Sequence, residues 1–294
     1  YLIKKRANEE LTLKNAQIMQ QKEEIEAQRD EIERQRDIVV KQKQEITDSI
    51  QYASRIQRAL LPPPETLDKA LPEYFLLNKP RDIVSGDFYW MTEKDGKILI
   101  AAADCTGHGV PGAFMSMLGV SFLTEISAHQ DAENADKILN MLRDYVMTSL
   151  RQTGKDQEAK DGMDIAMCII DFKQMKMQYA GAYNPLYLIR EKELSQVKAD
   201  KMPIGIHFKG NVPFTNNEIE IQKGDIFYIF SDGYVDQFGG TKGRKFMAKR
   251  FKEILLENHE KPMNQQKDIL NNTIEKWKGE HEQVDDMLVI GFKI

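Results

Sequence analysis

The chain has 294 residues, a formal net charge of −5, and 41% hydrophobic and 30% charged residues. This length suits one large domain or two small ones, and the ordinary Gly and Pro counts exclude a collagen-like, low-complexity or wholly disordered chain. The mild acidity lacks the basic footprint of nucleic-acid-binding domains, and the two cysteines, Cys105 and Cys168, are too few for a disulfide scaffold and fit a reducing compartment.

The beginning of the chain raises the question of a membrane anchor. Because the first residue is Tyr1 and not Met, we expect a longer natural protein, and Tyr1–Arg6 resembles the cytoplasmic end of a membrane helix. The alternative is a boundary inside an ordinary helix. The longest apolar runs, Ile98–Ala103 and Met287–Ile290, are strand-sized and far shorter than the roughly 20 residues of a membrane helix. The sequence therefore predicts a cytoplasmic protein, either free or tethered to the inner membrane from upstream.

A seven-residue apolar repeat runs through the first part of the chain, and no Gly or Pro interrupts Tyr1–Leu61. The repeat positions, called a, are Leu11, Ile18, Ile25, Ile32, Val39, Ile46, Ala53 and Leu60. Such a strict heptad is typical of a left-handed coiled coil, and β-branched residues at a favour two parallel helices. Most d positions are polar, as at Gln21 and Gln28, so we expect a weak, adjustable dimer. A rigid spacer or a single charge-paired helix is the alternative.

Pro62-Pro63-Pro64 ends this helix, because proline lacks the amide donor and clashes with the preceding turn. The predicted strands after it are Phe88–Met91, Lys97–Ala103, Ile165–Asp171, Met175–Ala180, Leu186–Arg190, Asp225–Phe230 and Met287–Lys293. The predicted helices are Pro111–Ala128, Ala135–Thr153, Lys245–Asn258 and Pro262–Lys278. Because several strands follow one another without helices between them, the pattern favours an α+β domain with antiparallel sheets over residues 62–294, preceded by a linker helix over residues 1–61.

Signatures of covalent catalysis are missing from the sequence. There is no Gly-x-Ser-x-Gly elbow and no Gly-x-x-x-x-Gly-Lys phosphate loop. A cysteine phosphatase needs an arginine six residues after its cysteine, where this chain has Pro111 and Gln174. The stretch from His281 to Asp285 only partly resembles a zinc-binding His-Glu-x-x-His helix. These absences argue against a covalent or zinc-dependent hydrolase.

Aspartates stand at the ends of several predicted strands. They are Asp87, Asp104, Asp232, and the pair Asp285 and Asp286. A charge beside a buried strand is costly unless something compensates it, and a shared divalent cation would compensate all of these acids. Carboxylates without nearby His or Cys suit Mg²⁺ or Mn²⁺. A single strand-end aspartate is more often a turn residue, and we interpret Asp225 in this way.

Six short blocks of sequence follow one another in a known order. They are SGDFYW (85–90), ADCTGHGVPGAF (103–114), YAGAYNPLYL (179–188), MPIG (202–205), FSDGYVDQ (230–237) and DDMLV (285–289). Together they resemble the SpoIIE/RsbU-type serine phosphatases, the bacterial branch of the metal-dependent type 2C protein phosphatases, from about Asp82 to Ile294. The stretch Asp48–Pro62 resembles the linker helix that joins sensory domains to such phosphatases.

The resemblance implies a four-layer α-β-β-α sandwich with two Mn²⁺ or Mg²⁺ ions at one end of the paired sheets. It assigns Asp87, as the bridging ligand, and Asp104 to the metals, together with the backbone carbonyl of Cys105. Asp232 and Asp285 complete the second site, or Asp286 replaces Asp285 if the alignment slips by one residue. Asp161 and Asp164 fall where some relatives hold a third, weaker metal.

Three further features of the loops follow from the resemblance. Gly107 and Gly109 let the backbone approach the site closely. His108 is either a proton donor, as a nearby histidine is in relatives, or a turn residue bonded to the backbone. Arg81 either orients the phosphate or is an ordinary surface arginine.

The resemblance implies hydrolysis of phosphoserine or phosphothreonine on a protein. Two cations roughly 3.5–4 Å apart would activate a water for in-line attack, without a covalent enzyme intermediate. The usual substrates of the family are phosphorylated anti-anti-sigma (STAS) proteins. We expect a homodimer in which an upstream sensory domain shifts the helix pairing and re-seats Ser49–Leu61 against the phosphatase. The alternative is a non-catalytic dimerising module that only binds a phosphoprotein.

Overall fold

The computed structural model describes residues 2–153, 160–207, 210 and 212–294, so Tyr1 of the predicted helix lies outside the described residues. The chain forms two compact units, Tyr1–Tyr52 and Ala53–Ile294. Helix α1 (Leu2–Leu60) makes up the first unit as far as it is described and continues into the second. The predicted boundary at residue 61 follows the end of this helix. The second unit includes its last two turns, because Ser54 and Gln57 are buried there.

The described part of the first unit, residues 2–52, is helical throughout, as the absence of Gly and Pro predicts. Its heptad a side chains are exposed, with Ile18, Ile25, Ile32, Val39 and Ile46 between 60% and 66% accessible. Exposed aliphatic side chains at seven-residue spacing form the stripe that a second helix would cover. Pairing of two such helices remains a prediction.

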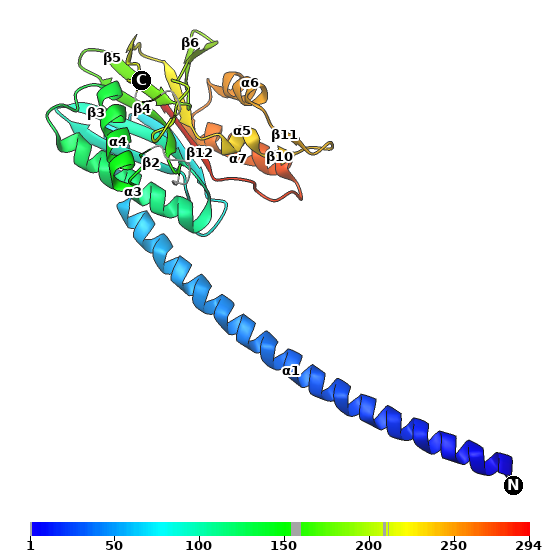
Figure 1. Ribbon diagram of the computed structural model, residues 1–294. Coiled ribbons are helices and arrows are strands. Elements are labelled where there is room, and N and C mark those ends of the chain that lie inside the picture. Colours follow the sequence, from blue (N-terminus) through cyan, green and yellow to red (C-terminus); the bar gives the residue numbers. More distant parts are fainter. Residues whose placement is uncertain (1, 154–159, 208–209, 211) are drawn as a thin grey trace. The chain divides into compact units, whose positions relative to one another are not determined.

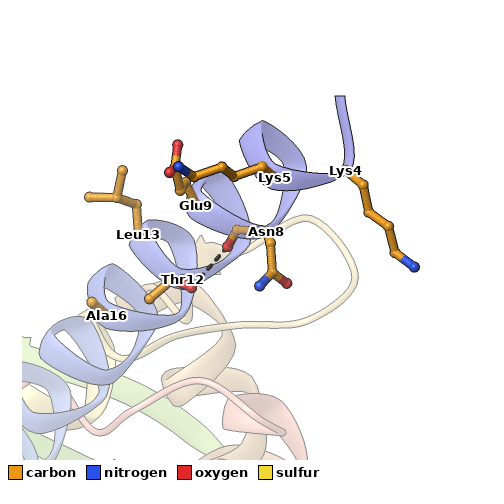
Figure 2. Close-up of a pocket in the computed structure, with 7 residues that line it drawn as sticks. All are labelled: Lys4, Lys5, Asn8, Glu9, Thr12, Leu13 and Ala16. Carbon is orange, nitrogen blue, oxygen red and sulfur yellow. Dashed lines mark hydrogen bonds between the residues drawn. The ribbon is translucent and has the colours of Figure 1, made fainter. Parts of the chain in front are cut away.

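The start of helix α1 carries a shallow hollow that is not a functional site. Figure 2 shows that the side chains around it all project from this one helix, and that the Thr12 hydroxyl donates to the Asn8 carbonyl oxygen at 2.8 Å. The hollow has no buried polar group, so it is the surface of an unpartnered helix.

Two five-stranded antiparallel sheets form the second unit. The first sheet has the order β2-β3-β4-β5-β8, with β2 Phe88–Lys94, β3 Lys97–Cys105, β4 Met163–Asp171, β5 Lys176–Ala182 and β8 Asn217–Glu220. The second has the order β1-β12-β9-β6-β7, with β1 Glu73–Lys79, β12 Met287–Lys293, β9 Ile226–Phe230, β6 Leu186–Arg190 and β7 Glu193–Val197. A short hairpin pairs β10 (Phe238–Gly239) with β11 (Arg244–Lys245).

Helices cover the outer face of each sheet (Figure 1). Helices α3 (Gly109–Ala128) and α4 (Ala135–Ser149) pack on the first sheet, and α6 (Ala248–Asn258) and α7 (Met263–Lys278) pack on the second. A third apolar cluster fills the space between the sheets. The short helices are α2 (Pro64–Ala70) and α5 (Gly233–Asp236). The predicted four-layer sandwich is therefore confirmed.

The predicted elements differ from the structure mainly at the edges. The strands Leu186–Arg190 and Met287–Lys293 match at both ends, whereas β1, β7, β8 and helix α2 were not predicted. The helix predicted from Lys245 is wrong over its first residues. Lys245 belongs to β11, and Met247 has a positive φ of 77° before the helix starts at Ala248. A left-handed residue cannot continue a right-handed helix, so it sets this boundary.

Helix α3 corrects the expectation that no segment has the length of a membrane helix. Gly109–Ala128 is long and apolar enough by composition, with a mean hydropathy of 1.3, although small and polar residues interrupt it. Leu123 and Ile126 are fully buried, and a Cβ on Gly119 would lie 2.7 Å from the Phe88 ring. Close packing on β2 and α4 therefore accounts for its apolar composition.

Asp225 stands at the end of β9 opposite to Asp232 and agrees with its interpretation as a turn residue. Its carboxylate is 2% exposed and accepts hydrogen bonds from Arg190 Nε at 2.8 Å, from Arg190 Nη2 at 2.6 Å, and from the Gln222 backbone N–H at 2.8 Å. This network fixes the turn that enters β9.

We expect Asp225→Ala to lower the free energy of unfolding by about 2 kcal/mol, because it removes a buried acceptor of charged hydrogen bonds while partly exposed Arg190 regains water. Urea unfolding of the purified chain measures this loss. Asp225→Asn, which keeps one acceptor oxygen, should lose less. An unchanged unfolding midpoint for Asp225→Ala would contradict the structural role.

Candidate active site

Four predicted acids lie at one end of the paired sheets. Strands β2 and β3 are antiparallel neighbours, so Asp87, just before β2, and Asp104, near the end of β3, lie at the same edge. In the other sheet, Asp232 follows β9 and Asp285 precedes its antiparallel neighbour β12. Each acid stands at a strand end because the buried apolar run that forms the strand stops next to it.

The carboxylates act on one another electrostatically. Asp87 is buried, and its pKa lies well above the ordinary value because of burial, with repulsion from Asp286, Asp285 and Asp232 adding to the shift. Burial also raises the pKa of Asp104, and the negative charges of Asp87 and Asp232 raise it further. Like charges that raise one another's pKa would be stabilised by a shared cation.

The donor set consists of carboxylate oxygens, which fits a hard divalent cation such as Mg²⁺ or Mn²⁺. Within the described residues, no three His, Cys, Asp or Glu side chains are already close enough together to hold a metal ion. The electrostatic coupling nevertheless links the acids across both sheets. The site is therefore a cluster of repelling carboxylates and not a finished coordination shell.

Asp232 and Asp285 form the more accessible side of this cluster. Asp232 is an exposed residue, although its carboxyl group is partly withdrawn from water, and this burial raises its pKa, with Asp236 and Asp285 adding to the shift. The pKa of Asp285 is also raised by burial, while the charges of His108 and Arg81 lower it. A substrate can therefore approach the acids from this side.

Asp286 has a different role from its neighbour. Its buried carboxylate accepts hydrogen bonds from the backbone N–H groups of Arg81 and Gly86, both at 2.7 Å. Both oxygens thus hold the loop that leads into Asp87. The Asp285 carboxylate accepts the N–H of Asp286 at 2.9 Å. The geometry therefore leaves Asp285, more than Asp286, with carboxylate oxygen available to bind a cation.

Ser231 is a site residue to which the sequence analysis gave no role. Its hydroxyl donates to Asp87 Oδ2 at 2.5 Å and accepts the backbone N–H of Leu288 at 2.9 Å. The side chain is fully buried. One hydroxyl thus ties the end of β9, β12 and the buried Asp87 together. The serine of the Ser-Asp-Gly block was the available signal.

The loop after β3 has the backbone geometry that its glycines predict, with φ of 83° at Gly107 and 64° at Gly109. His108 Nδ1 lies 3.2 Å from Asp82 Oδ2, so the ring meets a carboxylate and not the backbone that we expected for a turn histidine. Arg81 donates from Nη1 to the Val284 carbonyl oxygen at 3.0 Å. Cys105, the last residue of β3, is buried.

Of the two acids suggested for a third metal, the described contacts tie only Asp164 to the cluster. Asp164 lies in β4 directly opposite Asp104, and burial, with the charge of Asp232, raises its pKa to about 7. Asp161 lies before the strand, where its backbone carbonyl accepts the Gln152 side-chain amide at 2.6 Å.

Gln57, within the stretch Asp48–Pro62, is a second residue whose role was not apparent from the sequence. Its side-chain amide is buried near the end of α1 and donates to the Ser85 carbonyl oxygen at 2.6 Å and to Ser116 Oγ at 2.7 Å. Its oxygen accepts the Ser85 N–H at 3.1 Å. The end of α1 is therefore bonded to the loop two residues before Asp87.

Comparisons with known proteins agree with this geometry. The family described as Stage II sporulation protein E (SpoIIE) matches residues 94–294. Phosphoserine phosphatase RsbU of Bacillus subtilis is 26% identical over 200 residues, which cover 66% of this chain and 55% of RsbU. The chain thus spans about half the length of this curated relative.

Solved structures share the fold. The SiaA-PP2C domain of Pseudomonas aeruginosa superposes with a TM-score of 0.77 at 32% identity, covering 86% of this chain and 98% of that domain. The PP2C domain of SpoIIE from Bacillus subtilis, solved with a fragment of its regulatory domain, has a TM-score of 0.60 at 19% identity, covering 76% and 63%. Phosphatases of the PP2C family generally depend on divalent metal ions. With its sandwich fold and acidic site, the chain belongs to the SpoIIE family and carries a serine phosphatase domain of the RsbU and PP2C type.

Proposed function

We propose that this chain hydrolyses phosphoserine or phosphothreonine on a protein substrate, with two divalent cations, Mn²⁺ or Mg²⁺. The observation that carries the proposal is the gathering of Asp87, Asp104, Asp232 and Asp285 at one end of the paired sheets, where Asp232 and Asp285 raise the pKa of both Asp87 and Asp104. Family membership supports the same chemistry.

In this proposal Asp87 would be shared by the two cations, and Asp104, Asp232, Asp285 and the Cys105 carbonyl would supply the other ligands. Asp164, with Asp161, would hold a weaker third ion. Bound cations would activate a water and neutralise the phosphate. Ser231 and Asp286 would hold Asp87 and its loop in place, so that the nucleophile and phosphorus meet in line without a covalent enzyme intermediate.

The proposed substrate is a phosphorylated STAS-type anti-anti-sigma protein. The similarity to phosphoserine phosphatase RsbU supports this choice. The rival proposal is a non-catalytic signalling module that only binds the phosphoprotein, and it predicts no turnover under any metal condition.

Asp232→Asn should reduce the hydrolysis of p-nitrophenyl phosphate by at least roughly 100-fold, because the acids act as a unit around the cations. The assay uses the full chain with Mn²⁺, and with EDTA as the metal-free arm. Asp225→Asn is the matched control, since it changes an aspartate at the other end of β9 and should keep activity. Metal-dependent turnover that survives in Asp232→Asn would contradict the assigned site. Absence of both turnover and metal binding in the wild type would favour the signalling module.

Ser231→Ala should weaken Mn²⁺ binding by roughly 10- to 100-fold, because the hydroxyl that orients Asp87 is lost. Isothermal titration of the full chain with Mn²⁺ measures this effect independently of activity. Ser231→Thr keeps the hydroxyl and should bind metal more tightly than Ser231→Ala. Equal affinities for wild type and Ser231→Ala would exclude a positioning role.

We further propose that an upstream sensory domain controls this activity through a dimeric coiled coil. The exposed a side chains of α1 supply a seam, and the mostly polar d positions keep it weak enough to have alternative packings. The route to the site runs through Gln57, whose amide holds Ser85 two residues before Asp87. A shift of the helix would thus change how the loop before Asp87 is held.

Deletion of residues 1–44 should convert a dimer into a monomer and change Mn²⁺-dependent activity by at least about fivefold, the lower range of usual allosteric coupling. Light scattering and the p-nitrophenyl phosphate assay measure the two effects. Gln57→Leu, in the full chain, should keep the dimer yet reproduce the change in activity. If the deletion changes neither the number of chains in the particle measured by light scattering nor the activity, this regulatory proposal is wrong.

A further inference from the structure

A basic cavity lies beside the acidic site and has no role in the proposed chemistry. Its volume is about 690 Å³, and the segment from β10 to the start of α6 and Trp277 of α7 line it. Five cationic side chains line this cavity, and no acidic side chain does: Lys242, Arg244, Lys245, Lys249 and Arg250. The whole chain has a net charge of −5, so this cluster of positive charge differs from the average composition of the chain. We call this segment, residues 238–250, the basic loop.

The basic loop is anchored next to the acids by specific contacts. Lys245 Nζ lies 2.7 Å from Asp236 Oδ2, and the Asp236 N–H donates to the Asp232 carbonyl oxygen at 3.0 Å. The positive charge of Lys245 also lowers the pKa of Asp232. Asp236, the residue that pairs with Lys245, therefore lies about one helical turn, roughly 5 Å along the axis, after a proposed metal ligand.

Buried hydrogen bonds hold the base of the loop. Gln237 is fully buried, donates from Nε2 to the Glu282 carbonyl oxygen at 2.9 Å, and accepts the Val284 N–H at 3.2 Å. Trp277 Nε1 donates to the Gln237 carbonyl oxygen at 3.1 Å. The loop is thus tied to the segment that leads into Asp285. Figure 1 shows the β10–β11 hairpin beside α7.

Several cations of the loop face solvent without a fixed counter-charge. Within the described ranges, Lys242 and Arg244 are exposed and have no ion pair. The Arg250 guanidinium lies 4.2 Å from the centroid of the Trp277 ring, a cation–π contact. Met247, 58% exposed, adds an apolar contact surface. Exposed cationic side chains around an apolar surface suit an anionic peptide segment that also has apolar side chains.

We propose that the basic loop docks an acidic segment of the phosphoprotein substrate next to its phosphoserine, so that this site selects substrates by flanking negative charge. This inference rests on the phosphatase function proposed above. An extended peptide advances about 3.3–3.6 Å per residue, so acidic residues two to four positions from the phosphoserine would reach the loop. The occupant is a protein segment, because the loop adjoins the site where a phosphoprotein must bind.

Two phosphoserine peptides test the proposal, one with Glu at positions two to four from the phosphoserine and one with Gln there. With the full chain and Mn²⁺ at low salt, we expect KM for the Glu peptide to be about tenfold lower, since each exposed ion pair adds modestly. At 500 mM salt the preference should largely vanish. The double variant Lys242→Gln/Arg244→Gln should also lose the preference.

The matched control is Lys198→Gln/Lys223→Gln, which removes two exposed lysines outside the cavity and should keep the preference. Equal KM values for both peptides in the wild type, or a preference that survives in the double variant, would overturn the proposal. A separate assay tests the phosphatase function itself: if that function fails, the wild-type chain does not hydrolyse p-nitrophenyl phosphate. In that case, fluorescence anisotropy of the labelled peptides with the full chain decides the docking. Binding to phosphatidylserine vesicles without a peptide preference would overturn it in favour of a membrane surface.

Discussion

The mutual repulsion of carboxylates held side by side is the constraint on which this structure depends. A single buried carboxylate is already costly, and here burial and the charges of Asp232 and Asp285 raise the pKa of both Asp87 and Asp104. Such a cluster persists only because two antiparallel sheets deliver their strand ends to the same place. The helices that cover both sheets bury enough apolar surface to hold that arrangement.

Polar contacts around the acids give the cluster its form. Asp286 and Ser231 do not add donors to a cation in our proposal, but they fix the loop and the carboxylate of Asp87. Gln57 holds the same loop from the other side. The buried Asp87 is thus held by one residue that follows β9, one that precedes β12 and one from helix α1, each distant from it in sequence. Preorganisation of this kind is what a charged site needs, because it limits the rearrangement required when cations and phosphate bind.

The fold class and the strand-end positions of the four principal acids could be predicted because their signals are local, whereas their assignment as metal ligands came from the family resemblance. Apolar runs mark the central strands, and Asp104 and Asp232 directly follow such runs. Edge strands such as β7 and β8 escaped prediction because half of their residues face solvent and break the apolar pattern. The roles of Ser231 and Gln57 depend on contacts 144 and 28 residues apart, which no local pattern reveals. Asp285 and Asp286 also look alike in sequence. The sequence does not show that two backbone N–H groups from a distant loop bond to the carboxylate of Asp286.

The contact between Gln57 and Ser85 has one more consequence. A glutamine amide carries a donor and an acceptor in the same plane, so here the side chain imitates a neighbouring peptide group and pairs with both backbone polar groups of Ser85. Such a pairing is sensitive to angle more than to distance. A rotation of α1 about its own axis by one residue, about 100°, would turn the amide away, so that the Ser85 N–H would lose the Gln57 oxygen while the Ser85 carbonyl kept its hydrogen bond from Ser116 Oγ. Under the regulation proposed above, a torsion of α1 would act directly on this pairing, and a pull along the helix axis would act less directly.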